Sequence, residues 1–173
     1  MDIVTKTSRL LIQKANMGDT AFFLKLLNTP SWIKFIGDRG VKTEKQAEDY
    51  IQNSLVHSYE TNGFGLFKMV LRTALEPIGI CGFIQRDYLD HPDIGFAILP
   101  EYEGQGYTYE ACCSLMEYAK KELNIEEVLG ITMPNNTKSR NLLTKIGLLE
   151  SGKVIPPSKK EELLLFSNKK SHP

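Results

Sequence analysis

Hydrophobic residues follow two different periods along this chain, and the change of period separates predicted strands from predicted helices. In the first part of the chain, short aliphatic and aromatic runs bounded by turn residues predict β-strands. These runs cover 9–14, 64–71, 78–85 and 93–99, and Pro100 ends the last one. Because the last three runs are joined by short connections, they predict an antiparallel meander.

Two helices are expected among these early strands. Asp19 precedes an apolar helical segment that Asn28-Thr29-Pro30 is expected to end. Thr43 is followed three residues later by Gln46, which is the pattern of a capping box. The helix that this box opens is expected to close at Gly63.

The second part of the chain alternates strands with helices. Helical periodicity predicts helices over 107–123 and 136–146, and apolar runs predict strands over 127–133, 148–153 and 162–167. Because strand–helix–strand units favour parallel neighbours, one locally parallel pair is expected in an otherwise antiparallel sheet.

Length and composition fit a single soluble domain over 1–173, with a core over about 7–167 and a frayed tail at 168–173. The 21 Lys and Arg residues balance 21 Asp and Glu residues, so neither nucleic acid nor a membrane surface is an expected partner. No apolar run approaches the ~20 residues of a membrane helix, and the N-terminus lacks the apolar region of a signal peptide. We therefore expect a cytoplasmic protein.

No metal site is expected. The cysteines and histidines show no metal-ligand spacing and are scattered along the chain at Cys81, Cys112, Cys113, His57, His91 and His172. Free thiols in a reducing compartment are expected instead.

The most informative segment is a loop with two glycines, Gly104-Gln105-Gly106, placed between a predicted strand and a predicted helix. Glycines let the backbone approach a ligand, and the first amides and the dipole of a helix favour an anion. This predicts a phosphate or pyrophosphate site. A tight turn without a ligand stays open as an alternative, since neither the P-loop nor the GxGxxG pattern is present.

Several segments, collinear from about Thr7 to Lys153, resemble the GNAT superfamily of N-acetyltransferases, in the branch of ribosomal-protein N-acetyltransferases (RimJ/RimL-like). They are Ser8-Arg9-Leu10, Glu76-Pro77-Ile78-Gly79, Cys81-Gly82-Phe83, Asp93-Ile94-Gly95-Phe96, Pro100-Glu101-Tyr102, Gly104-Gln105-Gly106-Tyr107, Glu110-Ala111, and Pro134, Asn136, Ser139, Lys145 and Gly147.

The resemblance implies one α/β (α+β) domain, with a mixed, mostly antiparallel sheet splayed between its fourth and fifth strands. The pattern above supplies about seven strands and four helices for it. It also implies acetyl-CoA as co-substrate. Its pantetheine arm pairs with the backbone of Phe96, Ala97 and Ile98, and its pyrophosphate rests on the amides of Gly104, Gln105, Gly106, Tyr107, Thr108 and Tyr109. Asn136 contacts the pantetheine in the same analogy, although it also fits as an N-cap.

Two residues depart from the family's loop pattern, which begins with Arg or Gln and ends with Gly or Ala. Glu103 and Thr108 occupy these places here. An acid repels pyrophosphate unless its side chain turns away, and the threonine adds bulk. A non-catalytic CoA-binding module is therefore the alternative function.

Amide formation from a thioester needs a neutral amine, a stabilised oxyanion and a proton for the thiolate. Asp93 is the candidate base, acting through water at a position where related enzymes often have glutamate; a surface carboxylate is the alternative. Tyr88 and His91 are the reserve candidates for the base. The backbone amide of Ala97 or Ile98 is the expected oxyanion donor.

The thiolate proton comes in many family members from a tyrosine on the last helix, where this chain has Leu143. The resemblance to the RimJ/RimL-like branch places a serine there instead, and Ser139 fits. The expected function is acetyl-CoA-dependent N-acetylation of a primary amine by direct attack in a ternary complex. The acceptor is a small molecule or a protein N-terminus, and the protein is expected to be a monomer or homodimer.

Overall fold

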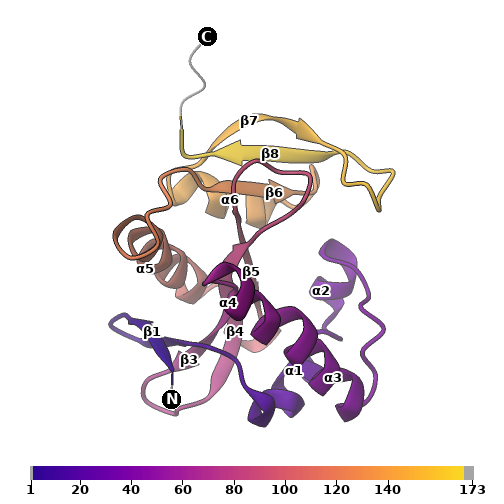
Figure 1. The fold of residues 1–173 in the computed structure, drawn as a ribbon, viewed down its shortest axis with the longest axis vertical. Coiled ribbons are helices and arrows are strands. Elements are labelled where there is room, and N and C mark those ends of the chain that lie inside the picture. Colours follow the sequence, from indigo (N-terminus) through magenta and orange to yellow (C-terminus); the bar gives the residue numbers. More distant parts are fainter. Residues whose placement is uncertain (1, 170–173) are drawn as a thin grey trace.

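A computed structural model describes residues 2–169 of the chain, and these residues build one mixed sheet with helices on it (Figure 1). The strand order is β1-β2-β3-β4-β5-β6-β8-β7. The strands are β1 (Ile3–Lys6), β2 (Leu10–Gln13), β3 (Leu66–Leu71), β4 (Pro77–Ile84), β5 (Asp93–Ile98), β6 (Leu129–Thr132), β7 (Leu149–Val154) and β8 (Leu163–Ser167). The β5–β6 pair is parallel, and the other neighbouring pairs are antiparallel. This confirms the predicted fold class, with the single parallel pair where the strand–helix–strand pattern placed it.

The helices are α1 (Thr20–Leu26), α2 (Pro30–Phe35), α3 (Glu44–Tyr50), α4 (His57–Asn62), α5 (Tyr107–Lys121) and α6 (Thr137–Lys145). Short 3-10 turns cover Met17–Asp19 and Pro100–Tyr102, and a π-helical segment, Ile51–Val56, joins α3 to α4. The capping box is confirmed, because Thr43 and Gln46 exchange side-chain bonds with each other's backbone N–H groups at 3.2 and 3.1 Å. The stop at Gly63 is also confirmed, with φ +77°.

Two elements differ from the sequence prediction. The first helix ends before Pro30 as expected, but a further helix that we did not predict, α2, begins there. Proline is tolerated at the first helical position, and Thr29 caps the helix. Strand β1 was missed, so eight strands are found among the described residues instead of about seven. Its mixed sequence, Ile-Val-Thr-Lys, is half-exposed at the sheet edge and carries little hydrophobic signal.

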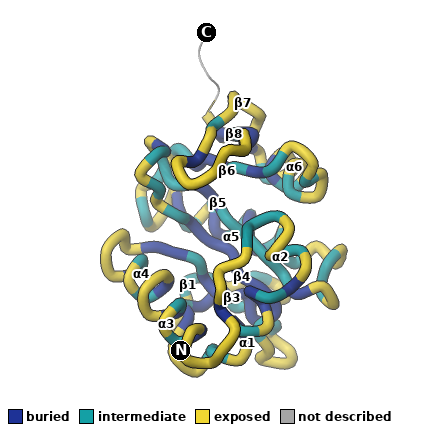
Figure 2. Tube along the Cα trace, turned by 90° about the vertical axis from the view of Figure 1, so that its right-hand side faces the viewer, coloured by how far each residue is buried: buried dark blue, intermediate teal, exposed yellow. Residues whose placement is uncertain are grey.

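The core lies between the central strands and the helices that pack on them. Its fully buried side chains include Phe23, Phe67, Phe83, Leu10, Ile12, Met69, Ile80 and Leu115. Figure 2 shows buried backbone gathered in the central strands, whereas β7 at the far edge is largely exposed.

The sheet opens between β5 and β6, which are the fourth and fifth of the predicted strands. Strand β5 pairs with β4 along its whole length, from Asp93 opposite Ile84 to Ile98 opposite Gly79. Toward β6 it forms one register pair, Asp93 with Leu129. The predicted splay is therefore present, and the β6 side of β5 beyond Asp93 is an open strand edge.

The C-terminal end of the described chain is anchored. Asn168 accepts a hydrogen bond from the Val128 N–H at 2.9 Å and donates one to the Glu126 carbonyl at 2.9 Å. Fraying from 168 onward was therefore wrong at this residue, and the rest of the predicted tail, 170–173, lies outside the described residues. Within 2–169, no helix is long and apolar enough to cross a membrane.

Candidate functional site

The open edge of β5 presents backbone groups of alternate residues. Leu99 donates its N–H to the Ile78 carbonyl on the β4 side at 2.8 Å, whereas the Pro92 carbonyl accepts from Leu129 on the β6 side at 2.9 Å. Because successive residues of a strand direct their hydrogen-bonding groups to opposite edges, Phe96 and Ile98 face the open edge. Their N–H and C=O groups are placed to pair with an amide-bearing chain.

The predicted role of the Ala97 backbone needs a correction. Its backbone groups point to β4, where it lies opposite Ile80, so they are turned away from the open edge. We had placed Ala97 beside Phe96 and Ile98 and had offered it as an oxyanion donor. Ile98 remains the candidate oxyanion donor, because its N–H faces the open edge.

The glycine loop has the conformation that an anion cradle needs. Gly104 and Gly106 have φ of +73° and +80°, in the left-handed region that favours glycine. Gly106 is the N-cap of α5 and supplies no side-chain cap, and the first intrahelical bond runs from Glu110 N–H to its carbonyl at 3.0 Å. The amides of the first turn, at Tyr107, Thr108 and Tyr109, therefore lack intrahelical partners and remain available to an anion.

Glu103 forms an ion pair with a residue that the sequence did not reveal. Lys138, on α6, lies 2.6 Å from the Glu103 carboxylate. The ion pair joins the loop after β5 to the helix after β6, across the splay of the sheet. The repulsion that we expected between Glu103 and pyrophosphate is reduced accordingly.

Asn136 caps α6, as the alternative interpretation held. Its Oδ1 accepts from the Ser139 N–H at 3.1 Å, which uses the side-chain oxygen and leaves the NH2 group uncommitted by the cap. Ser139 lies half-buried in the first turn of the same helix. Leu143, at the family's tyrosine position, is 1% exposed and belongs to the core. Asn136 and Ser139 therefore both lie at the N-terminal end of α6, which follows β6 in the chain.

Asp93 is a buried ion-paired carboxylate and not the surface carboxylate of the alternative interpretation. It is 1% exposed, and the Arg86 Nε and Nη2 atoms lie 2.6 and 3.3 Å from its two oxygens. Burial raises the pKa of Asp93, and the charge and hydrogen bonds of Arg86 oppose that rise. Of the reserve candidates, His91 lies 3.3 Å from Glu127, and the Tyr88 ring lies 6.0 Å from the Arg86 guanidinium.

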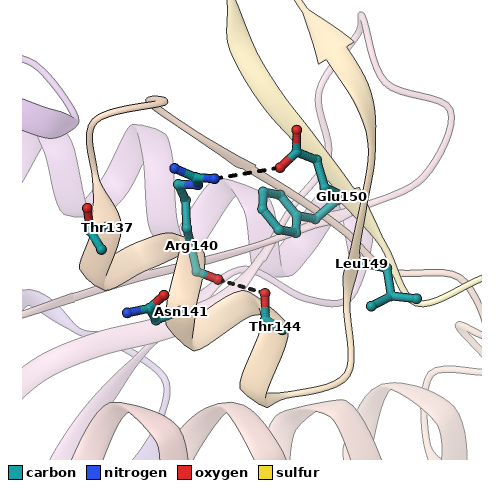
Figure 3. Close-up of a pocket in the computed structure, with 7 residues that line it drawn as sticks. Thr137, Arg140, Asn141, Thr144, Leu149 and Glu150 are labelled. Atoms are coloured by element: carbon teal, nitrogen blue, oxygen red, sulfur yellow. Dashed lines mark hydrogen bonds and ion pairs between the residues drawn. The ribbon is translucent and has the colours of Figure 1, made fainter.

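A cavity of about 250 Å³ lies elsewhere, between α6 and the β7–β8 hairpin (Figure 3). An ion pair between Arg140 and Glu150, 3.9 Å apart, crosses it. Its lining shares no residue with the β5 edge or the glycine loop. Among residues 2–169, no group of three or more His, Cys, Asp or Glu side chains is arranged to hold a metal ion.

Arg9 and Glu110 are site residues that sequence reasoning missed. They form an ion pair at 2.6 Å beside the glycine loop, although 101 positions separate them in the chain. Both residues belong to segments that carried the family resemblance, which was the available signal. Neither had been given a role.

Known proteins resemble this chain in sequence and in fold. The family model described as "Acetyltransferase (GNAT) domain" matches residues 9–149. The uncharacterized N-acetyltransferase YnaD of Bacillus subtilis is 29% identical over 159 residues, which cover 90% of this chain and 89% of that protein. The [ribosomal protein uS5]-alanine N-acetyltransferase of Escherichia coli is 28% identical over 91 residues, which cover 51% of this chain and 45% of the relative.

A solved structure shows the same fold. The Microcin C7 self immunity acetyltransferase MccE, in complex with acetyl-CoA and AMP, gives a TM-score of 0.79 at 14% identity. The match covers 93% of this chain and 92% of that one.

Proposed function

Because the chain belongs to the GNAT acetyltransferase family, it is an N-acetyltransferase that uses acetyl-CoA, and we propose that its acceptor is the α-amine of a protein N-terminus. The E. coli relative, which is named as an N-acetyltransferase of an alanine of ribosomal protein uS5, supports this choice. An α-amine titrates near ~8 and a lysine amine near ~10.4, so the α-amine needs less help from a base. Such an acceptor also favours a cytoplasmic location.

The open edge of β5 is the observation that carries the proposed placement of acetyl-CoA. In our proposal the pantetheine amides pair with the backbone of Phe96 and Ile98, and the pyrophosphate accepts from the amides of the first turn of α5. The NH2 group of Asn136 donates to the pantetheine from the facing helix. The Ile98 N–H is reserved in this proposal for the oxyanion that forms at the thioester carbonyl, so the pantetheine amides pair with the other open-edge groups of Phe96 and Ile98.

We assign the proton transfers to Asp93 and Ser139. Because Asp93 is 1% exposed, it accepts the amine proton through a water molecule and not by direct contact. The neutral amine nitrogen attacks the thioester carbon and forms the C–N bond. The C–S bond then breaks, and the Ser139 hydroxyl relays to the departing thiolate the proton that the attacking nitrogen loses. Burial raises the pKa of Cys112 well above its usual range, so this thiol stays protonated and a direct attack without an acyl-cysteine is favoured.

The acceptor is tested with three groups of amines. A panel of peptides with the N-terminal sequences of ribosomal proteins is incubated with acetyl-CoA, and the products are mapped by mass spectrometry. The matched control peptides have a blocked N-terminus and an internal lysine, and a set of small amines forms the third group. We expect one acetyl group on the free N-terminus of a peptide. Acetylation confined to small amines or to lysine contradicts the proposed acceptor.

A further inference from the structure

Arg9 lies immediately before β2 and contacts the glycine loop at consecutive positions. Its Nη1 donates to the Gln105 carbonyl at 2.9 Å, and its guanidinium lies 4.4 Å from the centre of the Tyr107 ring. Its Nη2 lies 3.5 Å from the position that a Cβ on Gly106 would occupy. One side chain therefore bonds Gln105, lies over the ring of Tyr107 and occupies the space beside Gly106 between them.

Glu110 holds that guanidinium in place. Its carboxylate accepts from Arg9 Nε at 2.6 Å, from the Arg9 backbone N–H at 2.9 Å and from Ser8 Oγ at 3.0 Å. Partial burial acts to raise the pKa of Glu110, but hydrogen bonds from Thr7, Arg9 and Ser8 outweigh it and lower the pKa to about 2. The carboxylate thus stays charged at neutral pH. Because it bonds Arg9 through Nε and the backbone N–H, Arg9 Nη1 can donate to the Gln105 carbonyl.

The bond to Gln105 fixes the direction of the next amide. The Gln105 carbonyl and the Gly106 N–H belong to one planar trans peptide, so they point in opposite directions. Arg9 approaches from β2, three strands away from the open side of β5. Its bond to the carbonyl turns the Gly106 N–H away from β2. Because glycine adopts both signs of φ at low cost, this peptide is free to flip unless something holds it.

We propose that Arg9 is a positioning residue for acetyl-CoA, which holds the 105–106 peptide so that its N–H faces the pyrophosphate. The inference rests on the proposed placement of pyrophosphate on this loop. Arg9 acts through the Gln105 carbonyl and does not need to touch the ligand. A lysine cannot replace it, since a single ammonium does not span Glu110 and the carbonyl as the guanidinium fork does.

Binding of two ligands separates this role from a general effect on folding. Affinity is measured by calorimetry for acetyl-CoA and by ligand-observed NMR for S-acetylpantetheine, which lacks the pyrophosphate. We expect Arg9→Ala to weaken acetyl-CoA binding about ten-fold, about 1.4 kcal/mol, and to leave S-acetylpantetheine binding unchanged. Arg9→Lys is expected to keep the melting temperature near that of the wild type without restoring the affinity, so it carries the test if Arg9→Ala does not fold.

Arg72→Ala is the matched control. Arg72 bonds the carbonyls of Thr7 and Ser8 at 2.9 and 3.2 Å, in the same turn, but reaches no loop residue, so both affinities should stay unchanged. Equal losses for the two ligands, or full acetyl-CoA affinity in Arg9→Ala or Arg9→Lys, overturn the inference. If the wild-type protein itself does not prefer acetyl-CoA over S-acetylpantetheine, the proposed placement of pyrophosphate fails.

Discussion

The buried pair of Asp93 and Arg86 tests the proposed chemistry and the stability of the fold together. Replacing one member of a buried ion pair costs about 3–5 kcal/mol when the partner stays fully buried. The Arg86 side chain is 27% exposed and can recover part of its hydration, so we expect Asp93→Asn to cost about 2 kcal/mol. At this chain length that lowers the melting temperature by roughly 4–8 °C.

The pH dependence of activity separates a base from a purely structural carboxylate. Arg86 lowers the pKa of Asp93, so Arg86→Met raises that pKa further. If the ionised carboxylate is the base, the acid limb of kcat against pH must move to higher pH in Arg86→Met, and kcat must fall in Asp93→Asn. Unfolding in urea and initial rates over a pH series measure both effects. An unmoved acid limb refutes Asp93 as the base, and an unchanged stability in Asp93→Asn refutes the energetic reasoning.

Three further predictions concern the loop and the helix ends. Asn136→Ala removes the cap of α6, which should cost about 1 kcal/mol in urea unfolding and weaken acetyl-CoA binding, whereas Asn136→Ser should recover the stability alone. Lys138→Ala leaves the charge of Glu103 unpaired, so acetyl-CoA should bind more weakly, and added salt should screen the repulsion and recover part of the loss; unchanged binding by calorimetry contradicts this. The lowered pKa of Glu110 means that its stabilisation is present above the unfolded value near 4.5 and is lost as pH falls toward about 2. Glu110→Gln should therefore flatten the acid side of the stability profile, and a profile parallel to the wild type contradicts that role.

Local pattern was sufficient for much of the fold. The meander of β3, β4 and β5 follows from short apolar runs and short turns, and the start of α5 follows from the two glycines. These features depend on residues near one another in sequence. The cap at Thr43 and the stop at Gly63 were predictable for the same reason.

The missed features depend on contacts between distant segments. The backbone groups of Ala97 face β4 because of the register between β5 and β4, and no local sequence pattern predicts that register. The burial of Asp93 and the contact of Arg9 with Glu110 likewise arise only when separate elements pack together. The charge of Glu103 predicted that it would repel pyrophosphate. Its ion pair with Lys138 could not be read from the sequence, because the two residues lie 35 positions apart.

The most direct test of the account is the melting temperature with and without saturating acetyl-CoA, in the wild type and in two glycine variants. Gly106→Asp strains the loop and adds a negative charge at the cradle. Gly63→Asp imposes similar strain at φ +77°, at the end of α4. At 100 times its dissociation constant, the ligand adds about 2.7 kcal/mol, or roughly 5–10 °C. The account predicts that shift in the wild type and in Gly63→Asp and its loss in Gly106→Asp; no shift in the wild type, or an equal shift in Gly106→Asp, contradicts it.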